Sequence, residues 1–295
     1  MKKSTAILLV LITGGFWGFS FVSMNYLMGK LDPMQVLAGR WTLAAVIFLA
    51  MAAVGVIRID LRKESVKYLI LGALMQPCVY SVLEIYGIKY TSVSVSSILL
   101  AVVPSMSLLI GMVFYRRRPP LIGIVGILTA FAGIVIANVF APDASAEGSV
   151  KGYIILIAGV TLLGFYGYVT SKAADGYGAM ERTAVMAFFG AITFNIVCLA
   201  RGFGAGTYSV IFGDLNAFLA IAFLGVVCSV ICYSSYNALL SGMEPATASN
   251  LIACITTSAG VVTGILIAGD SYGWYTLVGL VVTLIGVVLS SRSIE

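Results

Sequence analysis

Two ionisable side chains lie well inside stretches of sequence that are otherwise apolar, and they are the first candidates for chemistry. Arg40 lies in the stretch 34–56 and Glu84 in the stretch 66–88. Charged groups are costly in apolar surroundings, so they pair with one another or carry function. Glu84 has the chemistry to bind an ammonium group or to exchange a proton, and Arg40 has the charge to neutralise it.

Residue types exclude several other kinds of chemistry. The chain has no histidine, which excludes histidine-based acid–base catalysis and histidine-ligated metals. Its five cysteines lie in apolar stretches, where a thiol packs as a small hydrophobic group. The carboxylates are scattered and the sequence has no glycine-rich phosphate loop, so we expect no metal, no cofactor and no step driven directly by ATP.

The composition indicates that these residues lie in a lipid bilayer. Of the 295 residues, 60% are apolar and 10% are charged, against roughly 45–50% and about 25% in soluble domains. Despite a net charge of +5, too little charge is present to cover a water-facing surface. This balance excludes a soluble enzyme and a nucleic-acid-binding protein, and it makes the bilayer one partner of the chain.

Ten stretches are long enough to cross that bilayer, since a membrane helix needs about 20 mostly apolar residues. We therefore expect an all-α polytopic membrane protein. The first stretch is too long for a cleavable signal peptide. The predicted spans are 6–28, 34–56, 66–88, 92–115, 119–140, 151–173, 180–200, 215–240, 246–268 and 272–291.

Lysine and arginine near the span ends predict the orientation, because they concentrate on the cytoplasmic side. Twelve fall on the side of the amino terminus and four on the other. We expect both termini in the cytoplasm and the protein in the cytoplasmic membrane of the cell. The twelve are Lys2, Lys3, Arg58, Arg62, Lys63, Lys67, Arg116, Arg117, Arg118, Lys172, Arg182 and Arg292, and the four are Lys30, Lys89, Lys151 and Arg201.

The chain contains an internal repeat. A shift of 153 residues places Tyr80 on Tyr233, Glu84 on Asn237, Gly126 on Gly279 and Gly133 on Gly286, and a shift of 149 places Trp17 on Tyr166. Each half holds five predicted spans, an odd number, so the second half must cross the membrane in the opposite sense. We expect two five-helix repeats, 1–140 and 151–295, joined by a linker at 141–150. Inverted repeats are typical of secondary transporters, whose substrate site lies near the midplane where the halves meet.

Short motifs lie in a consistent order along the first half, and the second half repeats the pattern in one stretch. They are Trp17-Gly18-Phe19-Ser20-Phe21, Ala38-Gly39-Arg40-Trp41-Thr42-Leu43-Ala44, Tyr86-Gly87-Ile88-Lys89-Tyr90-Thr91-Ser92, Pro104 and the stretch 239–248. By these residues the chain resembles the EamA-type members of the drug/metabolite transporter superfamily over nearly its whole length. The Gly-Glu usual after the fourth and ninth spans is replaced by Arg116-Arg117-Arg118 and Gly269-Asp270. The resemblance implies a ten-helix carrier that moves small metabolites, often outward, around a central cavity.

Polar and aromatic residues inside the spans give the candidates for that cavity. Tyr80 and Glu84 are four residues apart and share a helix face. Aromatic rings attract cations by roughly 0.5–2 kcal/mol each, so rings around a carboxylate suit an organic cation or the ammonium end of an amino acid. The candidate substrate-binding residues are Glu84, Tyr80, Trp17, Tyr166, Tyr233, Asn237, Asn250 and Ser97.

The sequence leaves alternatives for each candidate. At 1.5 Å per residue, Arg40 and Glu84 lie roughly 9 and 6 Å from the same face of the membrane, so they are able to meet. They form a structural ion pair, or Glu84 binds substrate or a proton, or both side chains reach to the interface. The aromatic rings either bind substrate or simply pack in the core or in interfacial belts.

We expect a secondary-active transporter of small molecules, an exporter of amino acids or related amine or cationic compounds that works by alternating access. An importer coupled to protons or to exchange is the main alternative, and an integral membrane enzyme is a remote one. Two five-helix halves can complete a cavity, so a monomer suffices mechanically.

Overall fold

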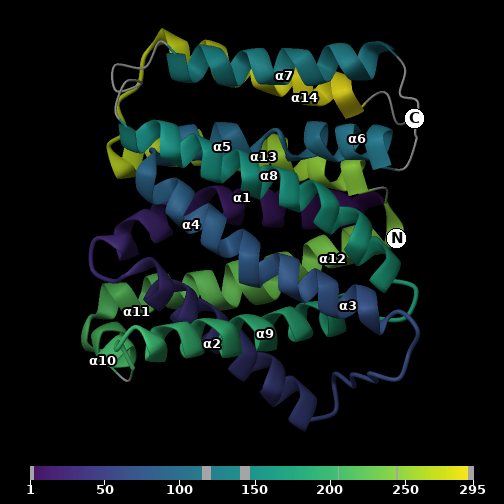
Figure 1. The fold of residues 1–295 in the computed structure, drawn as a ribbon, viewed down its shortest axis with the longest axis vertical. Helices are drawn as coiled ribbons and strands as arrows, with labels where there is room; N and C mark the ends of the chain where they lie inside the picture. The colour runs from purple at the N-terminus through teal and green to yellow at the C-terminus, as the bar shows by residue number, and fades with distance from the viewer. Residues whose placement is uncertain (1–2, 115–120, 140–146, 205, 244, 292–295) are drawn as a thin grey trace.

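A computed structural model describes residues 3–114, 121–139, 147–204, 206–243 and 245–291, and in these ranges the chain folds as a bundle of helices (Figure 1). Eight helical segments are long and apolar enough to cross a membrane, and two shorter apolar helices, Leu121–Ala137 and Trp274–Leu289, accompany them. Together they correspond to the ten spans expected from the sequence, so the predicted all-α fold is confirmed.

The first half supplies five spans. They are α1 (Lys3–Met28), α2 (Pro33–Ala53), a third made of α3 (Val66–Ala73), the π-helical η1 (Leu74–Val79) and α4 (Tyr80–Tyr90), a fourth made of α5 (Val93–Leu100) and α6 (Val103–Phe114), and α7 (Leu121–Val139).

The second half repeats this order. Its spans are α8 (Glu147–Ala173), α9 (Ala179–Ala200), a third made of α11 (Leu215–Ala222), the π-helical η2 (Phe223–Cys232) and α12 (Tyr233–Gly242), a fourth made of α13 (Pro245–Thr263) and η3 (Gly264–Ala268), and α14 (Trp274–Ser291), with the short α10 (Gly206–Gly213) after α9. Helix α8 begins at Glu147, so the last residues of the expected linker are helical, while 141–146 lie outside the described residues.

The second helix of each half begins in a similar way. At α2, the carboxylate of Asp32 accepts a hydrogen bond from the N–H of Met34 at 2.9 Å, and the Gln35 amide oxygen accepts one from the N–H of Asp32 at 2.9 Å. At α9, the Glu181 carboxylate accepts from the N–H of Gly178 at 2.7 Å. These contacts satisfy backbone donors that a helix start leaves free, and they fix where α2 and α9 start.

The third span of the first half is broken in its middle. Gln76 has φ −131° and ψ 116°, an extended conformation, and Pro77 follows it. Proline lacks an N–H and disfavours helical backbone at the residue before it. The equivalent η2 has no proline and continues as a wide helix. The break places Tyr80 and Glu84 on the separate helix α4.

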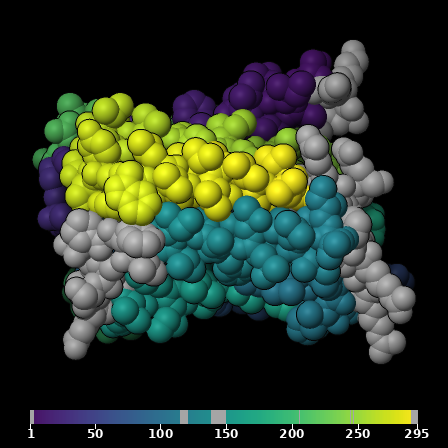
Figure 2. Space-filling view, turned by 90° about the horizontal axis from the view of Figure 1, so that it is seen from above, coloured from purple at the N-terminus to yellow at the C-terminus, as the bar shows by residue number. Residues whose placement is uncertain are grey.

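Helices α7 and α14 lie side by side and cover one face of the bundle (Figures 1 and 2). A Cβ atom added to Gly133 would lie 2.7 Å from the carbonyl oxygen of Gly279, and one added to Gly286 would lie 2.7 Å from that of Gly126. Only glycine permits backbones to approach so closely. The two contacts are equivalent, because the repeat places Gly133 on Gly286 and Gly126 on Gly279. The halves are therefore related by a local two-fold axis and run in opposite senses.

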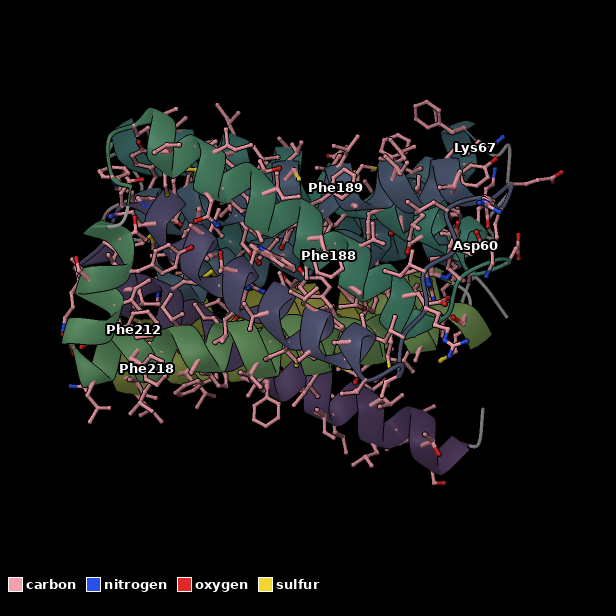
Figure 3. All side chains as sticks on the ribbon, turned by 90° about the horizontal axis from the view of Figure 1, so that it is seen from below. Asp60, Lys67, Phe188, Phe189, Phe212 and Phe218 are labelled. Atoms are coloured by element: carbon pink, nitrogen blue, oxygen red, sulfur yellow. The ribbon has the colours of Figure 1, made fainter. Side chains whose placement is uncertain are left out.

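The opposite face is formed by α2 and α9, with α10 and α11 beside them (Figure 3). Its labelled phenylalanines, Phe188, Phe189, Phe212 and Phe218, lie along the bundle, while Asp60 and Lys67 lie at one end. We call this end, where α1 and α9 begin, the amino-terminal end, and the other, where α2 and α11 begin, the far end. The elements α1, α4, α8, η2, α12 and α13 pack between the two faces and surround the centre.

Candidate substrate site

A small cavity lies where the two halves meet. Its walls come from α1, α2, α4, α8, α12, α13 and the fourth span of the first half, and they include Trp17, Arg40, Tyr80, Glu84, Tyr233 and Tyr236. Its volume is about 80 Å³, well below the roughly 300–1,000 Å³ of sites that hold drug-sized ligands. In this conformation the cavity has room for several water molecules or a small polar group.

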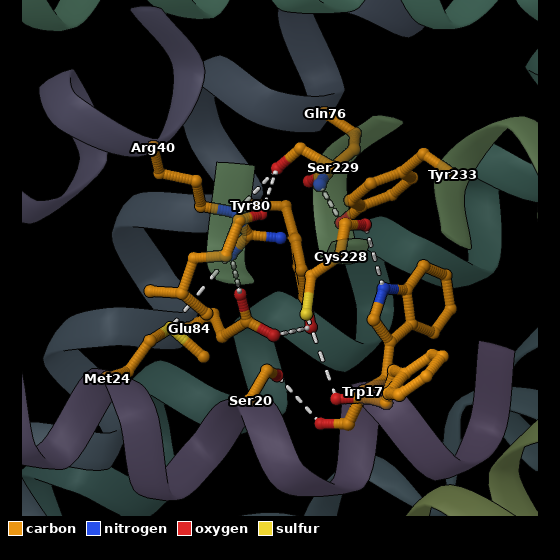
Figure 4. A network of polar contacts seen from close by, with 12 residues as sticks. Trp17, Ser20, Met24, Arg40, Gln76, Tyr80, Glu84, Cys228, Ser229 and Tyr233 are labelled. Carbon is orange, nitrogen blue, oxygen red and sulfur yellow. Dashed lines mark hydrogen bonds and ion pairs between the residues drawn. The ribbon is translucent and has the colours of Figure 1, made fainter. Parts of the chain in front are cut away.

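Arg40 and Glu84 form a loose ion pair on the cavity wall. Nη1 of Arg40 lies 3.9 Å from Oε2 of Glu84, and the two residues are 2% and 9% exposed. The other carboxylate oxygen, Oε1, accepts a hydrogen bond from the Tyr80 hydroxyl at 2.8 Å (Figure 4). Arg40 in turn donates through Nε to the Ser229 hydroxyl at 2.8 Å. A charged hydrogen bond is about 2.7–2.9 Å long, so at 3.9 Å the guanidinium and the carboxylate face one another without a direct hydrogen bond.

Aromatic rings form a second wall of the cavity. The ring centroids of Trp17 and Tyr233 are 4.9 Å apart, those of Trp17 and Tyr236 5.5 Å, and those of Trp41 and Tyr233 5.7 Å. The indole N–H of Trp17 donates to the carbonyl oxygen of Cys228 at 3.3 Å (Figure 4). The rings are therefore held in place by contacts with both halves.

Tyr166 and Asn237, two further candidates, lie in a separate buried cluster. The Tyr166 hydroxyl donates to Oδ1 of Asn237 at 3.3 Å, and Nδ2 of Asn237 donates to the hydroxyl of Thr183 at 3.0 Å. Neither Tyr166 nor Asn237 lines the central cavity. Tyr166 stacks on Tyr236, with ring centroids 6.4 Å apart, so the cluster touches the cavity wall from behind.

Arg182, one of the residues near the span ends from which the orientation is predicted, belongs to this buried cluster. It is 1% exposed and donates through Nη1 to the carbonyl oxygen of Thr170 at 3.0 Å. A count of arginines near the span ends contains no information on where each side chain points. Here the side chain folds inward, so a third buried charge accompanies Arg40 and Glu84.

The remaining two candidates do not reach the cavity. The Ser97 hydroxyl donates to the carbonyl oxygen of Val93, in its own helix, at 2.7 Å, and it lies against Gly260 of α13. Asn250 is 5% exposed, and its Oδ1 has no hydrogen-bond partner among the described residues. The structure therefore brings together Glu84, Tyr80, Trp17 and Tyr233, and it places Ser97 and Asn250 elsewhere.

Two residues at the site were not among the candidates from the sequence. Ser229 binds Arg40, and Tyr236 lines the cavity beside Trp17. Tyr236 follows from helical spacing, because it is three residues after Tyr233 on α12 and so shares its face. Ser229, in the π-helical η2, is the repeat equivalent of Gln76, the residue at the break four positions before Tyr80.

The comparisons with known proteins agree with this architecture. The model of the EamA-like transporter family matches residues 4–139 and 150–292. The uncharacterized transporter YcxC of Bacillus subtilis is 25% identical over 100% of this chain and 95% of its own length. An uncharacterized transporter of Archaeoglobus fulgidus is 24% identical over 99% of each chain. A protein crystal structure with 17% identity has a TM-score of 0.65 over 99% of this chain and 98% of its own, which shows a shared fold.

Proposed function

We propose, from the premise that the chain belongs to the EamA-like transporter family, that this multi-pass membrane transporter is a secondary-active exporter of amino acids or related amines. Two halves of one design, related by a local two-fold axis, support an alternating-access mechanism. Export is the direction that the family resemblance implies, and the gradients across the membrane decide it.

The observation that carries the proposal is a carboxylate beneath aromatic rings. Glu84 lines the cavity together with Trp17 and Tyr233, and rings and a carboxylate both attract an ammonium group. Its only cationic contact among the described residues is Arg40, at 3.9 Å. An ammonium group that came to hydrogen-bond distance would therefore hold the carboxylate more closely than Arg40 does.

Uptake of labelled amino acids and primary amines into inverted membrane vesicles tests the proposal. Glu84→Gln keeps the shape of the side chain and removes its charge, and we expect uptake to fall at least roughly tenfold because a charged hydrogen bond is lost. Glu64→Gln, the same change at an exposed residue before α3, is the matched control. Equal uptake by the wild type and the Glu84→Gln variant, at equal protein levels, would remove Glu84 from the site.

Proton coupling is the second candidate for the role of Glu84. A buried carboxylate between a hydroxyl and a guanidinium can release and accept a proton as those partners move, which favours proton-linked transport in either direction. Flux driven by a pH gradient should then disappear in the Glu84→Gln variant. A pH-driven flux that persists in that variant would assign proton coupling to another group.

A further inference from the structure

The described core contains more positive than negative charge. Three charged residues are buried there, Arg40, Glu84 and Arg182. Arg40 and Glu84 neutralise one another as an ion pair. Arg182 is not part of that pair, so its positive charge has to be stabilised by other groups.

The partners of Arg182 are all neutral oxygen atoms. Nη1 donates to the carbonyl oxygen of Thr170 at 3.0 Å, and Nη2 donates to the carbonyl oxygen of Asn237 and to the hydroxyl of Ser241. The third donor, Nε, is buried and has no hydrogen-bond partner in the part of the chain that the structure describes. Among the described residues no carboxylate forms an ion pair with Arg182. A buried guanidinium without an anion is costly, which is why such groups are normally paired.

The two halves differ at this point in an informative way. Each has an arginine on its second span that contacts the third span of the same half. Arg40 faces the side-chain carboxylate of Glu84 on α4, and Arg182 donates to the backbone carbonyl oxygen of Asn237 on α12. Under the shift of 153 residues Asn237 is the equivalent of Glu84. The second half therefore also has an arginine on its second span, although not at the repeat equivalent of Arg40, and it has a neutral amide where the first half has a carboxylate.

Arg182 and Glu84 lie toward opposite ends of the bundle and on opposite sides of the cavity. Arg182 is three residues after the first residue of α9, toward the amino-terminal end, and Glu84 is six residues before the last residue of α4, toward the far end. Between them lie Tyr236, which lines the cavity, and Tyr166, which stacks on it and bonds Asn237. Movement of these two rings would connect Arg182 to the cavity.

We infer that Arg182 accepts the carboxylate of the substrate when the bundle opens toward its amino-terminal end. The inference rests on the proposed function, in which Glu84 holds the amine. Because Arg182 and Glu84 lie toward opposite ends of the bundle, the substrate meets the two residues at different stages of transport. A zwitterionic amino acid has a charged group for each stage, which narrows the substrate class to such compounds. A carboxylate at Arg182 would supply the anion that no described residue provides there, and it would give Nε a hydrogen-bond acceptor.

A purely structural role makes a different prediction. Thr170 and Ser241 lie in the last turns of α8 and α12, and a cation there stabilises helix ends through their carbonyl groups. An arginine that acts only in this way would leave ligand preference unchanged when its charge is neutralised. Asn237→Asp separates the two roles, because it restores the carboxylate found in the first half without removing Arg182.

The test measures thermal stabilisation of the purified full-length protein by three probes, since a ligand that binds the folded state raises its stability. The probes are an amino acid, the primary amine obtained by removing its carboxyl group, and the carboxylic acid that lacks the amine. We expect the wild type to prefer the amino acid to the amine by roughly tenfold, the value of a charged hydrogen bond. Asn237→Asp should abolish that preference, and Asn195→Asp, at a partly buried asparagine that bonds Thr42 and Tyr208, should retain it.

Each of the other outcomes contradicts the inference, the proposed function or both. If the wild type binds amine and amino acid equally, the inference fails and the proposed function stands. If the preference exists but persists in both Asn237→Asp and Arg182→Gln, the carboxylate is bound elsewhere and the inference also fails. If the carboxylic acid binds through Arg182 while both amine-containing probes do not, the proposed function fails and the anion site stands. Binding of none of the three refutes both.

Discussion

Arg40 donates to Ser229 of the other half, and its charge faces Glu84 at 3.9 Å. Both charged side chains are almost completely withdrawn from solvent. Removal of one partner from such a pair leaves an uncompensated buried charge, which is more costly than removal of both. The pair therefore has a structural consequence that is separate from any role in transport.

Arg40→Gln should lower the free energy of unfolding by about 3–5 kcal/mol, because Glu84 is then buried without a cation. The double variant Arg40→Gln/Glu84→Gln should recover a large part of that loss. Thermal unfolding in detergent measures both. Losses that simply add in the double variant would show that the two side chains do not interact.

Trp17→Leu should weaken binding of an amine by roughly 2- to 30-fold, because the indole ring contributes about 0.5–2 kcal/mol to holding a cation. Trp17→Phe should weaken it less. Isothermal titration measures both affinities. Trp274→Leu, at a residue that is 60% exposed at the far end, is the matched control, and an equal effect there would argue against the aromatic wall.

At the level of single residues, the sequence identifies some members of the site and misses others for a physical reason. Glu84 stands out because it is an ionisable residue in an apolar stretch, and the repeat then links Tyr80 to Tyr233. Arg182 does not stand out, because it lies close to a span end. There, a difference of about two residues in position along the chain decides whether an arginine lies in a loop or is buried. Its inward direction depends on Thr170 and Asn237, which only the folded bundle brings near.

Among the helices, α7 and α14 show most directly how sequence becomes packing. Their glycines recur at the same spacing in each half, and the structure uses them where the two backbones meet. The break at Gln76 is of another kind, because Pro77 indicates an interruption but not where the following helix points. The glycine contact could therefore be predicted from the repeat, and the position of α4 could not.

Gly286→Ala should lower the free energy of unfolding by about 1–3 kcal/mol, because the added methyl group would meet the backbone of Ala130 and Gly126 in a contact with no spare volume. Gly15→Ala is the matched control, since a Cβ there has nothing within 4 Å. Thermal unfolding of the two variants measures the difference. An equal response of both would contradict the close approach of α7 and α14.

For the molecule as a whole, contacts between the halves occur at both ends. At the far end Lys30 pairs with Asp214, and Arg201 lies 3.4 Å from Asp32. At the amino-terminal end the Tyr177 hydroxyl donates to the carbonyl oxygen of Asp60 at 2.7 Å. The halves are thus connected on both sides of a small central cavity.

The pair at the far end should respond to acid. The Lys30 ammonium, together with the backbone N–H of Ala217, holds the pKa of the Asp214 carboxyl below its ordinary value. The ionised form is therefore stabilised in the folded state, and this stabilisation is complete above the ordinary carboxyl pKa and is lost as the pH falls through the lowered value. Asp214→Asn should remove this part of the acid dependence, measured as unfolding temperature between about pH 6 and pH 3. An unchanged acid dependence would mean that the pair does not form in solution.

The central claim is that this chain is a secondary carrier whose substrate is held at Glu84, and solute counterflow tests it most directly. Proteoliposomes containing the full chain are loaded with an unlabelled amino acid and diluted into a trace of the labelled one, without ATP. We predict transient accumulation of label by the wild type and by Glu64→Gln, and none by Glu84→Gln. Equal accumulation by Glu84→Gln, or none by the wild type across amino acids and amines, would contradict the claim.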